Sequence, residues 1–550
     1  MQSHDAAYHV DLGNNLRAQA RFTEAEASYR RALAIDPKSA AIRNNLGGAL
    51  KDQGLLDEAV ESYRQALALD PNLASAHFNL GFALHRQSKS REAAESYRRA
   101  AAANPNLASA YMGLAHVLQS QGQPGEAAAY YRRALELAPG TPAFHSFLLF
   151  CLQYDPAMTP GALLMEHRAY GASLPPAATG HTNPRDPDKR LNIGYIAPDL
   201  YAHPVGFMLM PVVAEHDRTK FAVLCYYGNP RVDGVTVFLK EHVENWRSTI
   251  GVDDAALAEM IRADGIDILV DLTGHTADNR LPVFARKPAP VQVSWAGYVG
   301  TTGLKAIDYL ITDRWHSPPG SERYAIEKLV RLPDGYACWA MPIHAPAVGP
   351  LSASTPGAVT FGCFNNLTKV NPLVVALWSR LLRELPQSRL VLKTFALGDA
   401  AVQARVMALF AVEGVSPERI VLEGASPHLG LLQRYNDIDI ALDPFPYSGG
   451  LTTIEALWMG VPVVTMPGER FASRHSFSHL SNAGLDELVA DGPETYLRIA
   501  RELAHDLPRL AALRAGMRER LNASPLRRSK DYTRGFEAAL RKMWKCWCDS

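Results

Sequence analysis

The chain has 550 residues, of which 47% are apolar and 20% charged, an ordinary globular composition with room for about three or four domains. Its 56 Lys and Arg residues balance 56 Asp and Glu residues, so it lacks the basic excess of a dedicated nucleic-acid binder. No apolar run approaches the length of a membrane span, so neither nucleic acid nor a membrane is expected as a partner.

The N-terminal residues Met1–Asp5 lack the basic and apolar regions of a signal peptide. The cysteines are scattered, without a Cys-x-x-Cys pair, at positions 151, 225, 338, 363, 546 and 548. They are typical of reduced thiols rather than of a disulfide framework or a zinc site. The sequence therefore predicts a cytoplasmic protein.

Residues 1–140 repeat one pattern at a period of 34 residues. The period links Pro37, Pro71, Pro105 and Pro139, and likewise Glu24, Glu58, Glu92 and Glu126, Tyr29, Tyr63, Tyr97 and Tyr131, and the small residues Gly13, Gly47, Gly81 and Ala115. Each unit predicts two helices joined by a turn, with the proline stopping the second helix. The pattern resembles the tetratricopeptide repeat, in four units.

Asn45 and Asn79 share one column of the repeat. Stacked repeats of this type form a ribbon whose concave face binds extended peptides. An asparagine amide donates and accepts at once, so these side chains could hold a peptide backbone. Alternatively, the amides only cap or bridge neighbouring helices.

From Phe144 to about Tyr170 a helical pattern continues without the repeat signature. The next stretch, up to Asp188, contains Pro175, Pro176, Pro184 and Pro187 and few large apolar residues. We therefore expect capping helices and a proline-rich linker over residues 141–188.

After the linker, short apolar runs alternate with amphipathic stretches such as Pro372–Leu385 and Asp399–Glu413. The expected strands are Leu191–Ala197, Phe221–Tyr227, Ile266–Leu272, Val291–Trp295 and Tyr309–Thr312, then Val359–Phe364, Leu390–Thr394, Ile420–Leu422, Ile438–Leu442 and Val461–Met466. Such runs are typical of parallel strands buried on both faces. With a Pro- and Ala-rich break at Pro342–Pro356, they predict two Rossmann-like, doubly wound α/β domains facing a cleft, at 189–345 and 346–550.

The segment Leu442–Leu457 is the richest in chemical signals. A buried strand ends in a turn, and Gly449 and Gly450 lead into a helix that begins near residue 451 or 452. Glycines let a ligand approach the backbone, and the free amides of a helix N-terminus favour a diphosphate. Glu455 could accept hydrogen bonds from ribose hydroxyls; alternatively, it is a surface residue of a plain strand-turn-helix.

Glu455-Ala456-Leu457, followed by Gly460–Val464, resembles the nucleotide-sugar site of the GT-B glycosyltransferases. More closely, the chain is similar to the O-linked N-acetylglucosamine transferases, in which tetratricopeptide repeats precede a GT-B catalytic region, and a bacterial homologue is expected. The resemblance is carried by GYIAPD at Gly194–Asp199 with His203-Pro204, PVQVSWAGY at Pro290–Tyr298 with Gly300-Thr301, FNNLTK at Phe364–Lys369, TMPG at Thr465–Gly468, and the tail around Tyr532 and Trp544.

The resemblance implies a set of donor-site roles. Lys369 would hold the donor diphosphate and stabilise the leaving group, and Asn366 would contact the phosphates. His428 would lie at the nucleotide, Glu455 on the ribose, and His203 near the reacting centre. Without the resemblance, Lys369 would be interpreted as an ordinary surface lysine and His428 as the first residue of a helix. His203 would be interpreted as a capping or core histidine.

Two positions depart from the family. The glycine turn (Gly449–Thr453) commonly carries His-Thr-Thr, where this chain has Gly450-Leu451-Thr452. One side-chain ligand of the donor is thereby lost. A larger share of donor binding would then come from the backbone amides of Gly449, Gly450, Leu451, Thr452 and Thr453. A lysine that commonly stacks on the base is replaced by Ala425, which bears on nucleotide preference.

The resemblance implies inverting transfer of N-acetylglucosamine from UDP-GlcNAc to Ser or Thr hydroxyls of intracellular proteins, with no cofactor or metal. Lys369 and the glycine-turn amides would offset charge on the leaving diphosphate. The candidate base is His203, with Glu259 or a donor phosphate oxygen as alternatives. Other functions left open are a SPINDLY-like protein O-fucosyltransferase using GDP-fucose, a transferase with a glycan or small-molecule acceptor, and a non-catalytic repeat adaptor.

Asp437-Ile438-Asp439 has the Asp-x-Asp pattern of metal-dependent glycosyltransferases. It leads directly into the apolar run Ile440–Leu442, so we interpret it as a strand entrance and expect no metal there. The spacing of Gly297, Gly300 and Gly303 does not match the nicotinamide-binding fingerprint.

Overall fold

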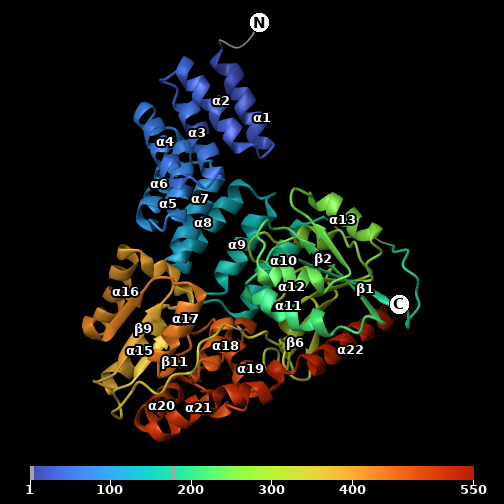
Figure 1. The fold of residues 1–550 in the computed structure, drawn as a ribbon, viewed down its shortest axis with the longest axis vertical. Helices are drawn as coiled ribbons and strands as arrows, with labels where there is room; N and C mark the ends of the chain where they lie inside the picture. Colours follow the sequence, from blue (N-terminus) through green and yellow to red (C-terminus); the bar gives the residue numbers. More distant parts are fainter. Residues whose placement is uncertain (1–4, 176–179, 343) are drawn as a thin grey trace. The chain divides into compact units, whose positions relative to one another are not determined.

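The computed structural model of the protein describes residues 5–175, 180–342 and 344–550 (Figure 1). Met1–His4 and Pro176, on which the expectations for the N-terminus and the linker partly rest, lie outside the described residues. The chain separates into two compact units. The first unit comprises Met1–Phe144 with Ala396–Arg405, and the second comprises His145–Phe395 with Val406–Ser550.

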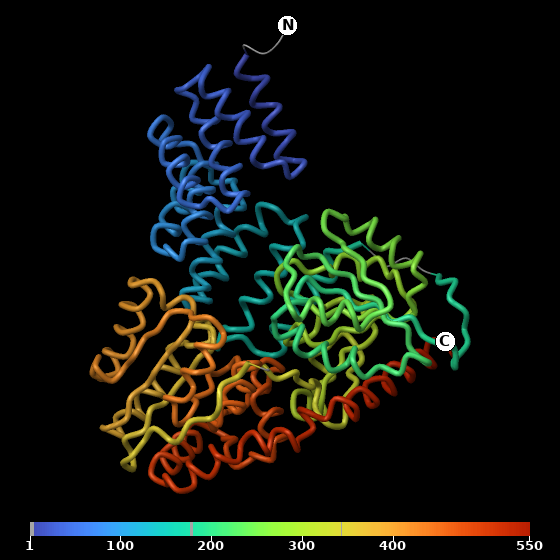
Figure 2. Tube along the Cα trace, viewed as in Figure 1, coloured from blue at the N-terminus to red at the C-terminus, as the bar shows by residue number. Residues whose placement is uncertain are grey.

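The first unit is built from successive helix pairs, which the trace in Figure 2 shows in blue. The helices are α1 (Ala6–Ala18), α2 (Phe22–Ile35), α3 (Ala40–Asp52), α4 (Leu56–Leu69), α5 (Ala74–Arg86), α6 (Ser90–Ala103), α7 (Ala108–Ser120) and α8 (Pro124–Leu137). The repeated tyrosines are buried between the paired helices. The prediction of helix-turn-helix repeats is confirmed.

The period depends on close approach of the two helices of a pair. A Cβ atom added at Gly13 would lie 2.6 Å from the Tyr29 ring, and one at Gly47 would lie 2.6 Å from the Tyr63 ring. Both rings are fully buried. A side chain larger than hydrogen at these positions would therefore force each pair apart.

The first α/β half of the second unit follows α9 (Pro142–Leu152) and α10 (Pro160–Ser173) along the chain. Its strands are β1 (Leu191–Ala197), β2 (Phe221–Tyr227), β3 (Asn245–Ser248), β4 (Ile268–Asp271), β5 (Val291–Ser294), β6 (Tyr309–Asp313) and β7 (Lys328–Leu332). They form one parallel sheet in the order β3-β2-β1-β4-β5-β6-β7. The helices between them are α11 (Pro204–Glu215), α12 (Gly234–Glu241), α13 (Asp254–Ala263) and α14 (Leu281–Ala285). Leu149 and Tyr170 share a buried cluster with Phe284, so α9 and α10 complete this core.

The second α/β half has the strands β8 (Thr360–Cys363), β9 (Arg389–Lys393), β10 (Ile420–Glu423), β11 (Ile440–Leu442) and β12 (Val463–Val464). They are parallel, in the order β10-β9-β8-β11-β12. The helices are α15 (Pro372–Glu384), α16 (Ala400–Val412), α17 (His428–Arg434), α18 (Leu451–Trp458), α19 (His475–Asn482), α20 (Pro493–His505), α21 (Leu507–Ala523) and α22 (Ser529–Cys548). The predicted fold class, a helical repeat array followed by two doubly wound parallel sheets, is confirmed. The expected limits at residues 140, 188 and 345 stay predictions.

Helix α22 follows the second half in sequence but packs on the first, as its red ribbon shows beside β6 in Figure 1. The ring of Phe536 lies 4.7 Å from that of Trp295. Oε1 of Glu537 lies 2.9 Å from Nδ1 of His216, and Trp544 donates its indole N–H to the main-chain oxygen of Asp186 at 2.8 Å. The two halves are therefore tied together by the returning helix as well as by the chain that links β7 to β8.

In the part of the chain that the structure describes, every helix is too short or too polar to cross a membrane. The cysteines are free thiols, and those at positions 151, 225, 338 and 363 are buried. Burial raises the pKa of Cys225, Cys338 and Cys363 to about 12, so these thiols stay protonated at neutral pH.

Candidate functional site

The residues expected to bind a donor gather at the carboxyl edge of the second sheet. The strand order reverses between β8 and β11, and ligands of doubly wound sheets bind beyond that point. Lys369 lies in the loop after β8, and the glycine turn follows β11. His428 opens α17 after β10, on the same edge.

The Lys369 ammonium joins the two loops that flank the switch point. Nζ donates to the main-chain oxygen of Ser448 at 2.8 Å and to Oδ1 of Asn365 at 3.1 Å. It also lies 4.2 Å from the centroid of the Tyr447 ring. Burial of the ammonium lowers the pKa of Lys369 to about 8, against the opposing effect of Asp443. At neutral pH the lysine therefore still carries its proton.

Asn365, rather than Asn366, supplies the buried amide of the site. Asn366 is exposed, and its Oδ1 accepts the N–H of Thr368 at 3.0 Å, which caps a short helical turn. Oδ1 of Asn365 accepts from Lys369 and, at 2.9 Å, from the hydroxyl of Thr452. The sequence did not single out Asn365, because nothing in one sequence separates two adjacent asparagines.

The glycine turn is shaped by a close approach at Gly449. Its N–H donates to Oδ1 of Asp443 at 2.7 Å, and an added Cβ would lie 2.4 Å from Oγ1 of Thr453. Thr453 in turn shares a 2.7 Å hydrogen bond with the hydroxyl of Ser476. This packing fixes the direction in which the turn enters α18.

Gly450 and Leu451 begin α18, and that helix end has no side-chain cap. Open space surrounds the position that a Cβ of Gly450 would take. The free amides of a helix N-terminus and its dipole favour an anion. The arrangement can therefore hold a phosphate with backbone groups, close to the Lys369 ammonium.

Asp443 is the buried counter-charge of this site, and the sequence analysis assigned it no role. Besides Gly449, it accepts the hydroxyl of Thr465 at 2.6 Å. Burial raises the pKa of Asp443 to about 6, while its hydrogen bonds and Lys369 oppose that shift. A signal existed in its position directly after the strand, where side chains of doubly wound folds reach the ligand edge.

His428 and Glu455 form a direct pair. Nε2 of His428 lies 2.7 Å from Oε1 of Glu455, and its Nδ1 lies 3.0 Å from Nε2 of His344. The hydrogen bond to Glu455 raises the pKa of His428, and partial burial opposes it. Glu455 is only 3% exposed, so it is not the surface residue of the alternative interpretation. The pair presents a carboxylate and an imidazole at the same sheet edge as Lys369.

His203 lies at the corresponding edge of the first sheet, as the N-cap of α11. Its Nδ1 accepts the N–H of Val205 at 3.3 Å, which leaves the proton of a neutral ring on Nε2. Burial lowers the pKa of His203, with Asp199 opposing the shift. The ring therefore offers an N–H donor at neutral pH. Among the described residues, no hydrogen bond or ring contact joins His203 to Lys369.

The alternative base Glu259 is 74% exposed on α13 and paired with Arg262, one turn away. A pocket of about 340 Å³ lies at the carboxyl ends of β1, β2 and β3. Its lining includes Asp254 and Arg280, which are 2.7 Å apart, but not Glu259. The polar groups at this edge of the first sheet are therefore Asp254 and Arg280 rather than the expected Glu259.

A buried polar chain joins the two α/β halves behind the glycine turn. Nδ1 of His316 lies 2.9 Å from Oδ2 of Asp313, and its Nε2 lies 2.9 Å from Nδ1 of His475. Burial would raise the pKa of Asp313, but His316 and the hydrogen bonds hold it well below its usual range. The N–H of His475 donates to Oγ of Ser448 at 2.9 Å. The contact between the halves therefore supports the turn that receives Lys369.

In the first unit, the two asparagines of the repeat column, Asn45 and Asn79, differ in their hydrogen bonds. Nδ2 of Asn79 donates to Oδ1 of Asn44 at 2.9 Å, which bridges α5 to α3. Asn45 is half-buried, and no hydrogen bond from its side chain is found within the described residues. Asn79 thus fits the bridging alternative, whereas the Asn45 amide is available to a ligand.

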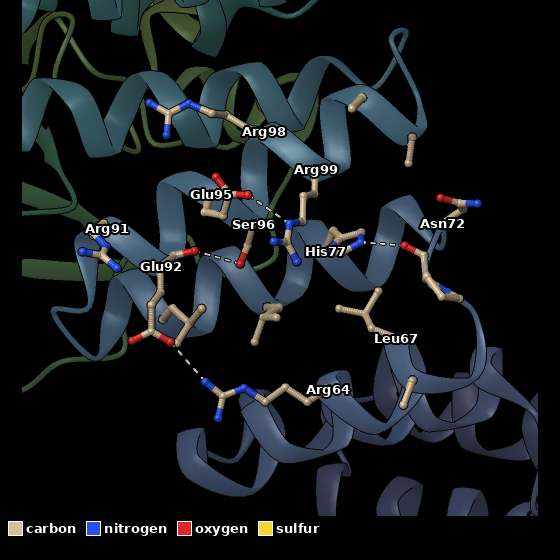
Figure 3. A pocket seen from close by; sticks show the side chains of 16 residues that line it. Arg64, Leu67, Asn72, His77, Arg91, Glu92, Glu95, Ser96, Arg98 and Arg99 are labelled. Atoms are coloured by element: carbon tan, nitrogen blue, oxygen red, sulfur yellow. Dashed lines mark hydrogen bonds and ion pairs between the residues drawn. The ribbon is translucent and has the colours of Figure 1, made fainter.

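A separate pocket of about 970 Å³ lies between α4 and α6 on the first unit (Figure 3). Among its lining residues, Arg64 forms an ion pair with Glu92 at 3.1 Å, and Arg99 pairs with Glu95 at 3.0 Å. The asparagines of the repeat column do not line this pocket. The pocket and the asparagine column are therefore different features of the repeats.

The family described as Glycosyl transferase family 41 matches residues 174–340 and 353–536. Families described as TPR repeat and Tetratricopeptide repeat match residues 13–54 and 49–88, and residues 78–142. These matches cover both α/β halves and the helical repeats.

The chain is 40% identical over 375 residues to a Petunia hybrida protein named "Probable UDP-N-acetylglucosamine--peptide N-acetylglucosaminyltransferase SPINDLY", covering 67% of this chain and 40% of that protein. An Arabidopsis thaliana protein with the same name but the ending SEC is 32% identical over 371 residues, covering 66% and 38%. The chain thus spans about 40% of the length of these relatives. A solved structure of a mutant of the Thermobaculum terrenum O-GlcNAc transferase is 38% identical, with a TM-score of 0.86, over 93% of this chain and 98% of that one.

Proposed function

The chain belongs to glycosyl transferase family 41, and from this we propose that it is an inverting glycosyltransferase that moves N-acetylglucosamine from UDP-GlcNAc to serine or threonine hydroxyls of proteins. The same proposal includes a cytoplasmic location and a bacterial source. Free, buried cysteines support the location, and the source rests on the resemblance alone.

One observation carries the proposal: the Lys369 ammonium spans the switch point and meets the turn that opens the uncapped α18. In glycosyl transfer from a nucleotide sugar, negative charge grows on the departing diphosphate. An ammonium and preorganised amides offset that charge without any reorganisation at the moment of reaction. The N–H groups of Gly449 and Thr453 are used within the fold, by Asp443 and by the main-chain oxygen of Gly450. The amides of Gly450–Thr452 and the Lys369 side chain have the chemistry for this task.

His428 and Glu455 would bind the nucleoside part of the donor. The Glu455 carboxylate can accept hydrogen bonds from the two ribose hydroxyls while it keeps its contact with His428. Asn366 is exposed beside this edge and remains a candidate for a phosphate contact. Its Nδ2 can donate to a phosphate oxygen while Oδ1 keeps its cap on Thr368.

In the transfer step, the acceptor oxygen attacks the anomeric carbon on the face opposite the diphosphate. A carbon–oxygen bond to the acceptor forms, the bond to the diphosphate breaks, and the configuration inverts. We place the acceptor proton on a donor phosphate oxygen, because His203 carries its own proton on Nε2 and Glu259 is engaged at the surface. His203 then orients the reactants as a hydrogen-bond donor.

The proposed reaction uses no metal ion, since Lys369 and the amides supply the positive charge. The carboxylates of the Asp-x-Asp pattern are committed elsewhere. Asp437 pairs with Arg434 at 2.9 Å, and Asp439 accepts the N–H groups of Ser352 and Thr360 at 3.0 and 2.8 Å. Within the described residues, no cluster of His, Cys, Asp or Glu has the makings of a metal site.

Protein acceptors would lie along the concave face of the repeats. Asn45 supplies an amide that is not used by the fold, and such an amide can pair with one peptide unit of an extended chain. A repeat groove of this kind fits a peptide better than a glycan or small-molecule acceptor.

Transfer of fucose from GDP-fucose is the second candidate. It is favoured by the space around Gly450, where the family commonly places a histidine, and by Ala425 in place of a base-stacking lysine. Both changes alter the nucleotide side of the site. A non-catalytic adaptor is disfavoured, because Lys369, His428 and Glu455 are all present and aligned at one sheet edge.

Calorimetry with UDP-GlcNAc, UDP, GDP-fucose and GDP tests the proposal. The proteins are the wild type, Lys369→Ala and Lys530→Ala, an exposed lysine of α22 that serves as the matched control. Preferential UDP binding that weakens only in Lys369→Ala supports N-acetylglucosamine transfer. A GDP preference moves the assignment to fucose, and absence of binding by every nucleotide leaves the adaptor.

A further inference from the structure

The Tyr447 ring contacts both a cation and a second aromatic ring. The Lys369 ammonium lies over it, 4.2 Å from its centroid. It also stacks on the Tyr154 ring, with centroids 4.9 Å apart and planes 22° apart. Tyr447 comes from the loop before the glycine turn, whereas Tyr154 comes from the chain between α9 and α10. Segments far apart in sequence therefore meet at the Tyr447 ring.

The two rings are held by the packing around them. Tyr154 is only 5% exposed. Tyr447 packs on a buried cluster formed by Tyr298, Val299 and Ala472, together with the partly buried Phe150 and Phe471. The ring of Phe150 lies 5.4 Å from that of Tyr154 and meets it edge-on. Both rings are therefore packed against neighbouring aromatic side chains.

The face of an aromatic ring attracts a cation, and more strongly where water is excluded. A lysine ammonium has three N–H donors, of which Ser448 and Asn365 take two in this protein. A ring at this distance therefore adds a third anchor that takes up no phosphate-binding hydrogen bond. It also keeps a flexible four-carbon side chain from spreading over several rotamers.

We propose that Tyr447, backed by Tyr154, is a positioning residue that holds the Lys369 ammonium where the diphosphate leaves. The proposal rests on the proposed function for its catalytic meaning. The arrangement of the rings and the lysine stands on the geometry alone.

The groups around Lys369 determine in which direction its pKa should change when the Tyr447 ring is removed. Burial lowers the pKa of Lys369 to about 8. Asp443, directly after β11, and Cys363, the last residue of β8, act on it electrostatically. Burial raises the pKa of Asp443 to about 6 and that of Cys363 to about 12. Burial holds the pKa of His475, on α19, well below its usual range, so that ring is neutral. Removing the Tyr447 ring takes away a contact that favours the ammonium, so the pKa of Lys369 should fall further.

The test compares Tyr447→Leu with Tyr447→Phe, which keeps the ring. The first readout is competitive acylation of Lys369 at pH 6 to 10, followed by peptide mass spectrometry. In Tyr447→Leu we expect the labelling midpoint to fall by about 0.5 to 1 pH unit, and in Tyr447→Phe to stay within error of the wild type. The second readout is turnover, where we expect kcat to fall about 3- to 30-fold in Tyr447→Leu and its alkaline limb to move to lower pH.

Tyr154→Leu and Tyr154→Phe form a second pair, with the same direction and a smaller effect expected for the leucine. This pair tests the arrangement if Tyr447→Leu does not fold. An unchanged labelling midpoint in the leucine variants overturns the proposal, as does a phenylalanine variant that behaves like its leucine partner. Acylation needs no donor, so a protein without turnover would contradict the proposed function and still decide this inference.

Discussion

Nζ of Lys369 lies 2.8 Å from the main-chain oxygen of Ser448, so one ammonium joins the loop after β8 to the turn after β11. The hydroxyl of the same serine accepts the N–H of His475, at the contact between the α/β halves. The position of the lysine, the shape of the glycine turn and the contact between the halves therefore depend on one another.

The first prediction concerns the charge of Lys369. Turnover should fall as the pH rises above about 8, because the pKa of Lys369 is lowered to about 8 and a neutral amine cannot offset the leaving diphosphate. Lys369→Ala should lose on the order of 100-fold or more in kcat at pH 7 while its circular dichroism stays that of the wild type. Near-normal turnover in this variant would refute the role.

The lowered pKa of Lys369 affects stability in the opposite direction to turnover: turnover should fall as the pH rises, whereas stability should increase. The unfolded chain binds the lysine proton more tightly than the folded chain does, so the contribution of Lys369 to the free energy of unfolding should rise with pH above about 8. Urea unfolding of the wild type and Lys369→Ala at pH 7 and pH 9 measures that difference. The alanine variant should be relatively more stable at pH 7 than at pH 9.

A second prediction uses the adjacent glycines as a matched pair. A Cβ at residue 449 would lie 2.4 Å from Oγ1 of Thr453, whereas nothing lies within 4 Å of a Cβ at residue 450. Gly449→Ala should cost about 1 to 3 kcal/mol of stability and abolish donor binding, because the turn must open. Gly450→Ala should leave the stability unchanged. Urea unfolding and donor calorimetry decide this, and equal losses in both variants would contradict the steric argument.

A third prediction concerns the buried chain of Asp313, His316 and His475. Asp313→Asn should cost about 2 to 4 kcal/mol at pH 7, because it removes the carboxylate beside His316. Since the pKa of Asp313 is held well below its usual range, its contribution is present at neutral pH and is lost as the pH falls below about 4. The difference in the free energy of unfolding between the wild type and Asp313→Asn, measured with urea, should therefore become smaller as the pH is lowered. Asp531→Asn, at a side chain that is 52% exposed, is the control and should show neither effect.

A fourth prediction separates two asparagines of the repeats. Asn45→Ala should raise KM for a peptide acceptor about 2- to 10-fold and leave the melting temperature unchanged, because the fold does not use that amide. Asn79→Ala should lower the melting temperature, because it breaks the bond to Asn44. The acceptor is any peptide that the wild type glycosylates in a Ser/Thr library. An unaltered KM in Asn45→Ala would exclude the amide from peptide binding.

The sequence predicted best those elements whose residues are uniformly buried. The strands expected at Leu191–Ala197 and Phe221–Tyr227 are β1 and β2 to the residue, because a central parallel strand is apolar along nearly its whole length. β3 (Asn245–Ser248) and β7 (Lys328–Leu332) were missed. Both lie at sheet edges, where polar residues are tolerated and no apolar run is needed.

The candidate site was predictable in its location but less so in its contacts. Spacing placed Lys369 and the glycine turn after strands, and parallel strands bring such loops to one edge. The choice of Asn365 over Asn366, and the burial of Asp443, depend on side-chain directions that a single sequence does not encode. The tautomer of His203 likewise follows from its contact with Val205, which appears only in three dimensions.

The return of α22 to the first half has a consequence for biosynthesis. A nascent chain leaves the ribosome from its N-terminus, so β1–β7 are available long before the residues that cover them. The contacts of Trp295 with Phe536 and of His216 with Glu537 cannot form until α22 has been synthesised, more than two hundred residues later. During that interval the first sheet has an uncovered apolar surface, and chaperones in the cell have their best opportunity to bind it.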